Sequence, residues 1–361
     1  MSANAVLIEP QAPDTAKLQA LVGRAIVESS AAMQAGLVVL GDRLGLYRAL
    51  AAGGAMRPHE LARRTGTSER YVLEWLNANA ASGYVEYLPR GGRYRMTPEQ
   101  AAMLAWEDSP ANMVGGFEIA LAAVRIVDRL EQAFRSGDGI GWAEHHHLVF
   151  HGCERFYRSG YLAHLVQEWI PALDGMLERL QAGASVADIG CGHGAATILL
   201  AQAFPNSRFV GYDSHTASVE IAVERARRAG VLGRVSFEVA SAVDYPGRDF
   251  DLVTVFDALH DMGDPVGASA HVLTTLKADG TWMIVEPNAG DRTEDNLHPV
   301  GRAFYAASTL MCTPCAKHQG KVALGAQAGE ARLRAVVTAG GFSRWRRAAQ
   351  TDINLVLEAR P

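Results

Sequence analysis

The sequence predicts an α/β domain with a largely parallel sheet in its second half and a mainly α-helical domain in its first half. Three observations support this. A glycine-rich turn joins an apolar run to a helical pattern at residues 186–204. Strand-like and helix-like segments alternate from residue 176 onward. The last two strand-like segments have only Thr351 and Asp352 between them, so they must pair antiparallel.

Size and composition set the broad class. The 361 residues suffice for two domains, and 48% hydrophobic with 20% charged residues is typical of globular proteins. The net charge of -5 argues against non-specific binding to nucleic acid or membrane surfaces. No apolar run is long enough to span a bilayer, and residues 1–11 lack the pattern of a signal peptide. Four cysteines are too few for a disulfide framework, so we expect a cytoplasmic protein.

The N-terminal region begins with residues 1–20, a mixed segment with two prolines that we expect to form an arm. Residues 21–51 then show apolar residues at helical spacing. Gly36, Gly41 and Gly45 in this stretch would allow close approach of another helix, so a homodimer is expected.

Residues 21–100 are interpreted as one domain. Residues 58–64 read as a short helix, Ser68 as the N-cap of a helix through Ala81, and residues 83–88 and 92–97 as a two-stranded wing. This resembles a winged helix-turn-helix, whose obvious use is DNA binding. The second helix is not basic, however, since it carries Glu69, Arg70 and Glu74. We therefore favour dimerisation and walling of a substrate pocket.

Residues 101–175 are helical and rich in aromatic side chains, which indicates a linker and a lid over a substrate. They include His145, His146 and His147, with His151 and Cys153 nearby. Only His147 and His151 have the spacing of a helical metal-binding pair. A pocket-lining cluster is the favoured interpretation, and a zinc site is the alternative.

The glycine turn lies in residues 176–361. Gly190, Gly192 and Gly194 follow an apolar strand that carries Asp188, and a second strand ends at Asp213. Glycines let the backbone bend sharply and let a ligand lie against it. The spacing also satisfies the dinucleotide fingerprint, so it does not by itself identify the ligand.

The two acids beside this turn carry a resemblance to the Rossmann-like S-adenosylmethionine-dependent methyltransferases. In that family the acid-x-Gly-x-Gly-x-Gly turn holds the methionine part of the cofactor, which implies this role for Asp188, Gly190, Gly192 and Gly194. The acid ending the second strand holds the ribose, which implies that role for Asp213. The resemblance also implies cofactor contacts by four further residues: Ser214, Ser241, Ala242 and Phe256.

The C-terminal hairpin supports the same family. A seven-stranded sheet that is parallel except for a terminal antiparallel hairpin is its signature. A nicotinamide dehydrogenase would be expected to continue into a catalytic domain instead. The resemblance therefore implies S-adenosylmethionine as cofactor and a small molecule as methyl acceptor.

The segment after the fourth strand offers a catalytic base. His260 and Asp261 lie where carboxyl ends of parallel strands open on a ligand crevice, and histidine titrates near neutral pH. In plant-type O-methyltransferases a similarly placed His-Asp pair supplies the base, which implies that His260 is catalytic, with Asp261 or Asp257 orienting it. The alternative is that His260 only lines the pocket.

Residues 286–327 form a long insertion that we expect to be a second lid. Glu286 at its start is a further candidate to face the pocket. Cys312 and Cys315 lack a second cysteine pair, so we expect reduced, buried thiols and no metal. The sequence thus predicts methyl transfer from S-adenosylmethionine to an oxygen or nitrogen of a small molecule. The competing hypothesis is a regulator that binds this cofactor and uses its winged helix on DNA.

Overall fold

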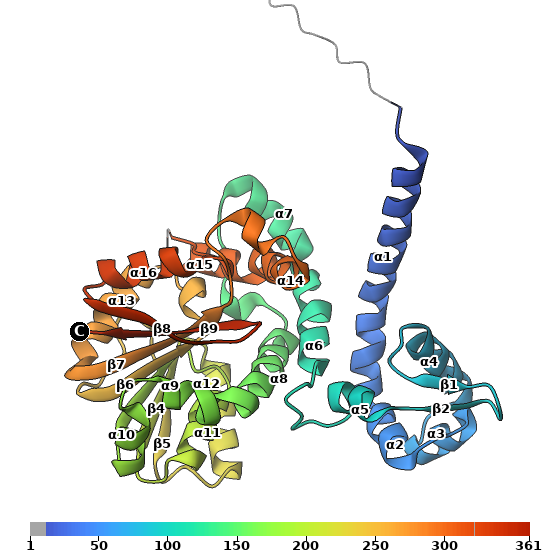
Figure 1. The fold of residues 1–361 in the computed structure, drawn as a ribbon, viewed down its shortest axis with the longest axis horizontal. Helices are drawn as coiled ribbons and strands as arrows, with labels where there is room; N and C mark the ends of the chain where they lie inside the picture. Colours follow the sequence, from blue (N-terminus) through green and yellow to red (C-terminus); the bar gives the residue numbers. More distant parts are fainter. Residues whose placement is uncertain (1–11, 321) are drawn as a thin grey trace, which may run out of the picture. The chain divides into compact units, whose positions relative to one another are not determined.

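The computed structural model describes residues 12–320 and 322–361, which form two compact units that divide between Thr97 and Pro98 (Figure 1). Each unit is considered by itself below. No helix within the described ranges combines the length and the hydropathy needed to cross a bilayer.

The first unit begins with the long helix α1 (Thr15–Arg43). Asp14 caps this helix, since its carboxylate accepts hydrogen bonds from the backbone N–H groups of Ala16 and Lys17 at 2.9 and 3.1 Å. The helix therefore starts inside the segment that was expected to form an arm. Residues 1–11 of that segment lie outside the described residues.

The remainder of the first unit is a winged helix-turn-helix, as the sequence predicts. Gly45, with φ +68°, ends the helical run, so the single pattern over residues 21–51 is two helices. Gly41 is a point of close approach within the unit, because a Cβ there would overlap the ring of Trp75. After α1 come α2 (Leu46–Gly53), α3 (Pro58–Thr65), α4 (Glu69–Ala81) and the antiparallel strands β1 (Glu86–Leu88) and β2 (Arg93–Arg95).

The second unit is built on a seven-stranded sheet in the order β5-β4-β3-β6-β7-β9-β8. All neighbours are parallel except β9, which runs antiparallel to both β7 and β8. The predicted sheet with its terminal hairpin is therefore confirmed. The strands are β3 (Ser185–Ile189), β4 (Arg208–Asp213), β5 (Val235–Val239), β6 (Phe250–Phe256), β7 (Leu276–Pro287), β8 (Arg344–Gln350) and β9 (Asn354–Arg360).

Helices cover both faces of this sheet, which explains why its central strands read as almost continuous apolar runs (Figure 1). Val186 and Leu252 face one side, and their neighbours Ala187 and Val253 face the other. The first side is packed by α10 (Met176–Ala182), α11 (Ala195–Ala203) and α12 (Thr216–Arg228). The second side is packed by α13 (Pro265–Thr275) and α16 (Glu330–Ala339).

Two helical segments far apart in the sequence meet beyond the carboxyl ends of the strands. The residues before β3 form α5 (Pro98–Leu104), α6 (Val114–Ala123), α7 (Val127–Ser136), α8 (His147–His164) and α9 (Ile170–Ala172). The insertion after β7 forms α14 (Pro299–Ala307), the π-helical turn Ser308–Cys312 and α15 (Thr313–Gln319). Ala122, Val149 and Met311 share one apolar cluster, so the two segments pack together as a single cover.

Candidate active site

A cavity of about 1150 Å³ lies between this cover and the carboxyl ends of β3, β4 and β6. Pockets for one drug-sized ligand reach about 1,000 Å³, so this cavity has room for two ligands side by side. The cover contributes mainly apolar side chains, among them Phe117, Trp142, Phe150, Phe156, Tyr157 and Leu310.

The glycine loop after β3 forms one wall of the cavity. The backbone N–H groups of Gly190 and Cys191 both donate to the carbonyl of Tyr212, at 2.8 and 3.1 Å, which ties the loop to β4. Gly192 has φ +52° and no atom within 4 Å of where a Cβ would stand. The bend therefore needs a residue free to take positive φ, and the space beside it is open to a ligand.

Gly194 has a different position from the other two glycines. It is not among the residues that line the cavity. It caps α11 with φ +76°, and a Cβ there would lie 2.6 Å from Cζ of Phe237. The structure thus places Gly194 behind the loop, where it allows close packing of helix and strand.

Asp188 lies at the bottom of the cavity and is 2% exposed. Its two carboxylate oxygens accept hydrogen bonds from the hydroxyls of Thr197 at 2.5 Å and Thr254 at 2.9 Å. Burial raises the pKa of Asp188 to about 6, although the two hydroxyl hydrogen bonds oppose the shift. The carboxylate is therefore ionised at neutral pH and loses its charge in mild acid.

Asp213 ends β4 at the opposite side of the glycine loop. Its Oδ2 accepts the backbone N–H of Gly192 and its Oδ1 accepts that of His215, both at 2.8 Å. The carboxylate therefore holds the loop and still has lone pairs free toward the cavity. Burial raises its pKa. The other residues expected near the cofactor, namely Ser214, Ser241, Ala242 and Phe256, also line the cavity.

His260 lies across the cavity on the short 3₁₀ turn Leu259–Asp261 after β6, and it is 2% exposed. Its Nδ1 lies 2.5 Å from Oε2 of Glu286, which sits near the carboxyl end of β7. The other oxygen of Glu286 accepts the backbone N–H groups of Leu259 and His260 at 2.9 and 3.4 Å. Glu286 therefore holds Nδ1 of the imidazole, a contact that was not expected, while the expected partner Asp261 lies at the other ring nitrogen.

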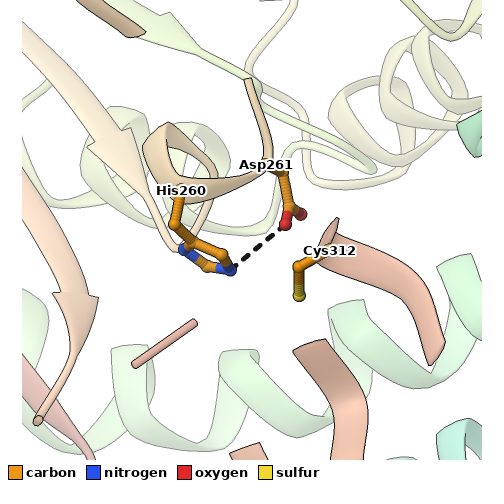
Figure 2. Close-up of side chains that lie close together, drawn as sticks. All are labelled: His260, Asp261 and Cys312. Atoms are coloured by element: carbon orange, nitrogen blue, oxygen red, sulfur yellow. Dashed lines mark ion pairs between the residues drawn. The ribbon is translucent and has the colours of Figure 1, made fainter. Parts of the chain in front are cut away.

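Asp261 lies on the other side of the ring. Its Oδ1 forms an ion pair with Nε2 of His260 at 3.2 Å (Figure 2), and donor atoms of His260, Asp261 and Cys312 lie within 4.8 Å of one another. Burial alone would lower the pKa of His260, but the charges of Glu286 and Asp261 outweigh it, so the pKa is well above its ordinary value. The two carboxylates therefore stabilise the protonated form of the imidazole relative to the neutral form.

Asp257 is the residue directly after β6, and it takes φ +49°. Non-glycine residues rarely adopt this conformation, and such strain is concentrated at functional sites. Its Oδ1 accepts a hydrogen bond from Asn354 at 2.8 Å, while the buried Oδ2 has no hydrogen-bond partner. Burial, reinforced by the charge of Glu286, raises the pKa of Asp257 well above its ordinary value. This carboxyl group lines the cavity.

Sequence reasoning missed several polar residues in the cavity wall, among them Glu154 and His193. Glu154 on α8 forms ion pairs with Arg158 and Arg225. His193 lies inside the glycine loop, and burial lowers its pKa to about 4. Its position between two glycines of the motif was a usable signal, whereas no local pattern marked Glu154.

The histidines at the start of α8 make different contacts, although the rings of His146 and His147 lie 4.1 Å apart. His146 caps α8 by accepting the N–H of Leu148 at 3.2 Å, and His145 is buried with its pKa lowered by desolvation. His151 lies 2.8 Å from the buried carboxylate of Glu118. His151, which has helical spacing from His147, therefore pairs with a carboxylate.

Family models and known proteins agree with this architecture. Residues 180–339 match the model described as a methyltransferase domain, and residues 31–106 match the Rv2258c-like winged HTH domain. The 27-O-demethylrifamycin SV methyltransferase of Amycolatopsis mediterranei is 34% identical over 146 residues, covering 38% of this chain and 53% of that enzyme. The trans-aconitate 2-methyltransferase of Paracidovorax citrulli is 31% identical over 127 residues, covering 35% and 46%. The chain thus spans about half the length of these curated relatives.

Solved structures match over almost the whole chain. The mitomycin 7-O-methyltransferase superposes with a TM-score of 0.70 at 19% identity, covering 96% of this chain and all of that one. The human N-acetylserotonin methyltransferase, solved in complex with S-adenosylmethionine, gives 0.70 at 17% identity, covering 98% and 99%. At these identities the likeness shows a shared fold.

Proposed function

We propose that this chain, which carries a methyltransferase domain behind a winged helix-turn-helix domain, transfers a methyl group from S-adenosylmethionine to an oxygen atom of a largely apolar small molecule. The observation that carries the proposal is the shared cavity. The glycine loop, Asp188 and Asp213 line one part of it, and His260 lines another. Cofactor and acceptor can therefore bind in contact with one another.

The residues of the loop fit the cofactor. Gly192 leaves an open surface beside backbone N–H groups, Asp213 has lone pairs for the two ribose hydroxyls, and ionised Asp188 faces the end where an ammonium group would lie. The bound cofactor supplies an electrophilic methyl group on a sulfonium. The protein's task is then to hold the acceptor in line with that methyl and to manage one proton.

His260 is the residue that accepts this proton. Glu286 holds Nδ1, which directs Nε2 to the cavity as the site that receives the acceptor's proton. The carboxylates of Glu286 and Asp261 raise the pKa of His260, which makes the neutral imidazole a stronger base and stabilises the imidazolium–oxyanion pair that forms when the acceptor gives up its proton. A phenol, an enol or a carboxylic acid forms such an ion pair on losing its proton, whereas an ammonium group becomes a neutral amine beside the imidazolium. This charge favours oxygen over nitrogen as the methylated atom.

The acceptor binds beneath the aromatic cover. Mostly apolar walls and room for a second ligand favour a multi-ring or long-chain acceptor over a small polar acid. Incubation of metabolite extracts with isotopically labelled S-adenosylmethionine, followed by mass spectrometry, should reveal a labelled product of this kind.

Calorimetry with S-adenosylhomocysteine tests the cofactor directly. We expect one molecule bound per chain and no binding of NAD. Protein that binds NAD but not S-adenosylhomocysteine would contradict the proposal.

We also propose that the protein is a homodimer formed through α1. Apolar side chains stand exposed along this helix, including Ile26 at 63%, Val27 at 66% and Met33 at 71%. Exposed apolar stripes of this length mark protein contacts. Light scattering should give the mass of two chains, and Ile26→Lys with Val27→Lys should give the mass of one.

The alternative of a DNA-binding regulator is not favoured. Arg70 on α4, the helix that would enter the major groove, is paired with Glu74. A gel shift with genomic fragments would detect such binding. Four free thiols fit a reducing compartment, so we propose a cytoplasmic location.

A further inference from the structure

We infer that His260, Asp261 and Cys312 form a binding site for one zinc ion in the wall of the cavity. The metal site itself does not depend on the proposed methyl transfer. It revises the expectation that the thiols of the insertion bind no metal.

The three donor atoms converge from two segments of the chain. His260 and Asp261 lie on the turn after β6, and Cys312 ends the π-helical turn of the insertion (Figure 2). One nitrogen, one carboxylate oxygen and one sulfur lie within 4.8 Å of one another. Ligand atoms of a tetrahedral zinc site lie roughly 3.5 Å apart, so side-chain rotations that move the donor atoms together by about 1 Å would form the site.

Glu286 prepares His260 for this role. Histidines that bind metals almost always donate their other ring N–H to a carboxylate or carbonyl group, which fixes the ring and raises its basicity. Glu286 takes Nδ1 at 2.5 Å and is itself held by two backbone N–H groups. Nε2 is thereby directed toward Asp261 and Cys312.

Asp261 and Cys312 interact with each other and with His260 at the proposed site. Oδ1 of Asp261 is buried and makes no hydrogen bond, although it lies 3.2 Å from Nε2 of His260. Cys312 is 7% exposed and is a free thiol. A cation between these groups would replace the protons of the imidazolium and the thiol, so binding forms three metal–ligand bonds and releases protons to the buffer.

The donor set selects zinc among the common cations. Magnesium and calcium prefer oxygen ligands only, whereas nitrogen, oxygen and sulfur together suit zinc. All three residues line the cavity, so the fourth position faces it and can be taken by water or by an acceptor oxygen. Under the proposed function, a zinc ion on Nε2 would occupy the atom that receives the acceptor's proton. Zinc and catalysis would then exclude each other.

Metal-free full-length protein titrated with Co²⁺ as a spectroscopic stand-in tests the site. We expect one ion per chain, with a sulfur-to-cobalt charge-transfer band, and one Zn²⁺ that displaces it. Cys312→Ser should abolish the charge-transfer band. Cys315→Ser is the matched control, because Cys315 lies one turn further along the same helical segment, is also buried and is outside the triad. It should keep the band.

The affinity of Glu286→Gln for the metal provides a second test. We expect it to be about tenfold weaker or more, because the variant loses the carboxylate that supports the histidine ligand. Absence of stoichiometric binding would overturn the inference. A charge-transfer band that survives Cys312→Ser, or one that disappears with Cys315→Ser, would do the same. Binding of S-adenosylhomocysteine to the metal-free protein, measured in parallel, separates failure of this inference from failure of the proposed function.

Discussion

Glu286 accepts the Nδ1 hydrogen of His260 at 2.5 Å although the two residues belong to different loops and strands. The pairing arises because β6 and β7 are parallel neighbours, so the turn after one strand meets the end of the other. The contact fixes which nitrogen of His260 faces the cavity. Under the proposed mechanism, it therefore determines which nitrogen receives the acceptor's proton.

Replacing His260 by alanine should lower turnover about a hundredfold, which is the usual contribution of a general base. Binding of S-adenosylhomocysteine should be unchanged, because the cofactor residues lie on other strands. Turnover measured under saturating acceptor, with calorimetry in parallel, checks both. His271→Ala is a control, since His271 is outside the cavity. Unchanged turnover in His260→Ala would remove the base from the mechanism.

Glu286→Gln should shift the acid limb of the pH–rate profile to lower pH. The Glu286 carboxylate helps to raise the pKa of His260, so its removal lets the imidazole lose its proton at lower pH. A reduction of turnover by about tenfold should accompany the shift, because the ring is held less well. A profile that keeps its position would show that His260 does not govern the limb.

Asp213→Asn should weaken binding of S-adenosylhomocysteine at least tenfold. The substitution removes the charge that accepts the N–H of Gly192 and that would accept the ribose hydroxyls, and hydrogen bonds to a charged group contribute about 1.5–3 kcal/mol. Calorimetry measures the change. Asp279→Asn is the control, since this exposed residue pairs with Arg179 away from the cavity. Normal affinity in Asp213→Asn would contradict the assignment of the sugar site.

Affinity for S-adenosylhomocysteine should fall as the pH drops below about 6, where Asp188 becomes protonated. An ionised carboxylate attracts the ligand's ammonium group and a neutral one does not. Because a single proton is involved, the affinity should fall at most about tenfold per pH unit. Asp188→Asn should bind weakly at pH 7 and should lose the part of the slope due to this residue. An unaltered slope in the variant would assign the titration to another group.

Gly194→Ala should destabilise the fold by about 2–4 kcal/mol, as the sum of a positive φ and overlap with the ring of Phe237. Gly230→Ala separates these two effects, because Gly230 has φ +70° but nothing within 4 Å of a Cβ. That control should cost only about 1–2 kcal/mol. Urea unfolding of both variants measures the two losses of stability. Equal losses would show that Phe237 moves away from the added methyl group at little cost.

Much of the architecture could be predicted from the sequence because its signals are local. The strand–glycine–helix turn at Asp188–Gly194, the acid at Asp213 and the two-residue hairpin link at Thr351 each depend on neighbouring residues. Helix starts were less certain, since Asp14 caps α1 within a segment that two prolines made look irregular.

The sequence by itself determined the fold of the second unit and the residues of the glycine loop, because periodicity and turn chemistry act over a few residues. Only the tertiary structure decided that Glu286 orients His260, that Cys312 faces Asp261 and that Gly194 supports packing rather than lining the cavity. These contacts join segments separated by 26 to 51 positions in the chain. Such contacts are set by the order of the strands and by the packing of the insertion, and no local pattern encodes either.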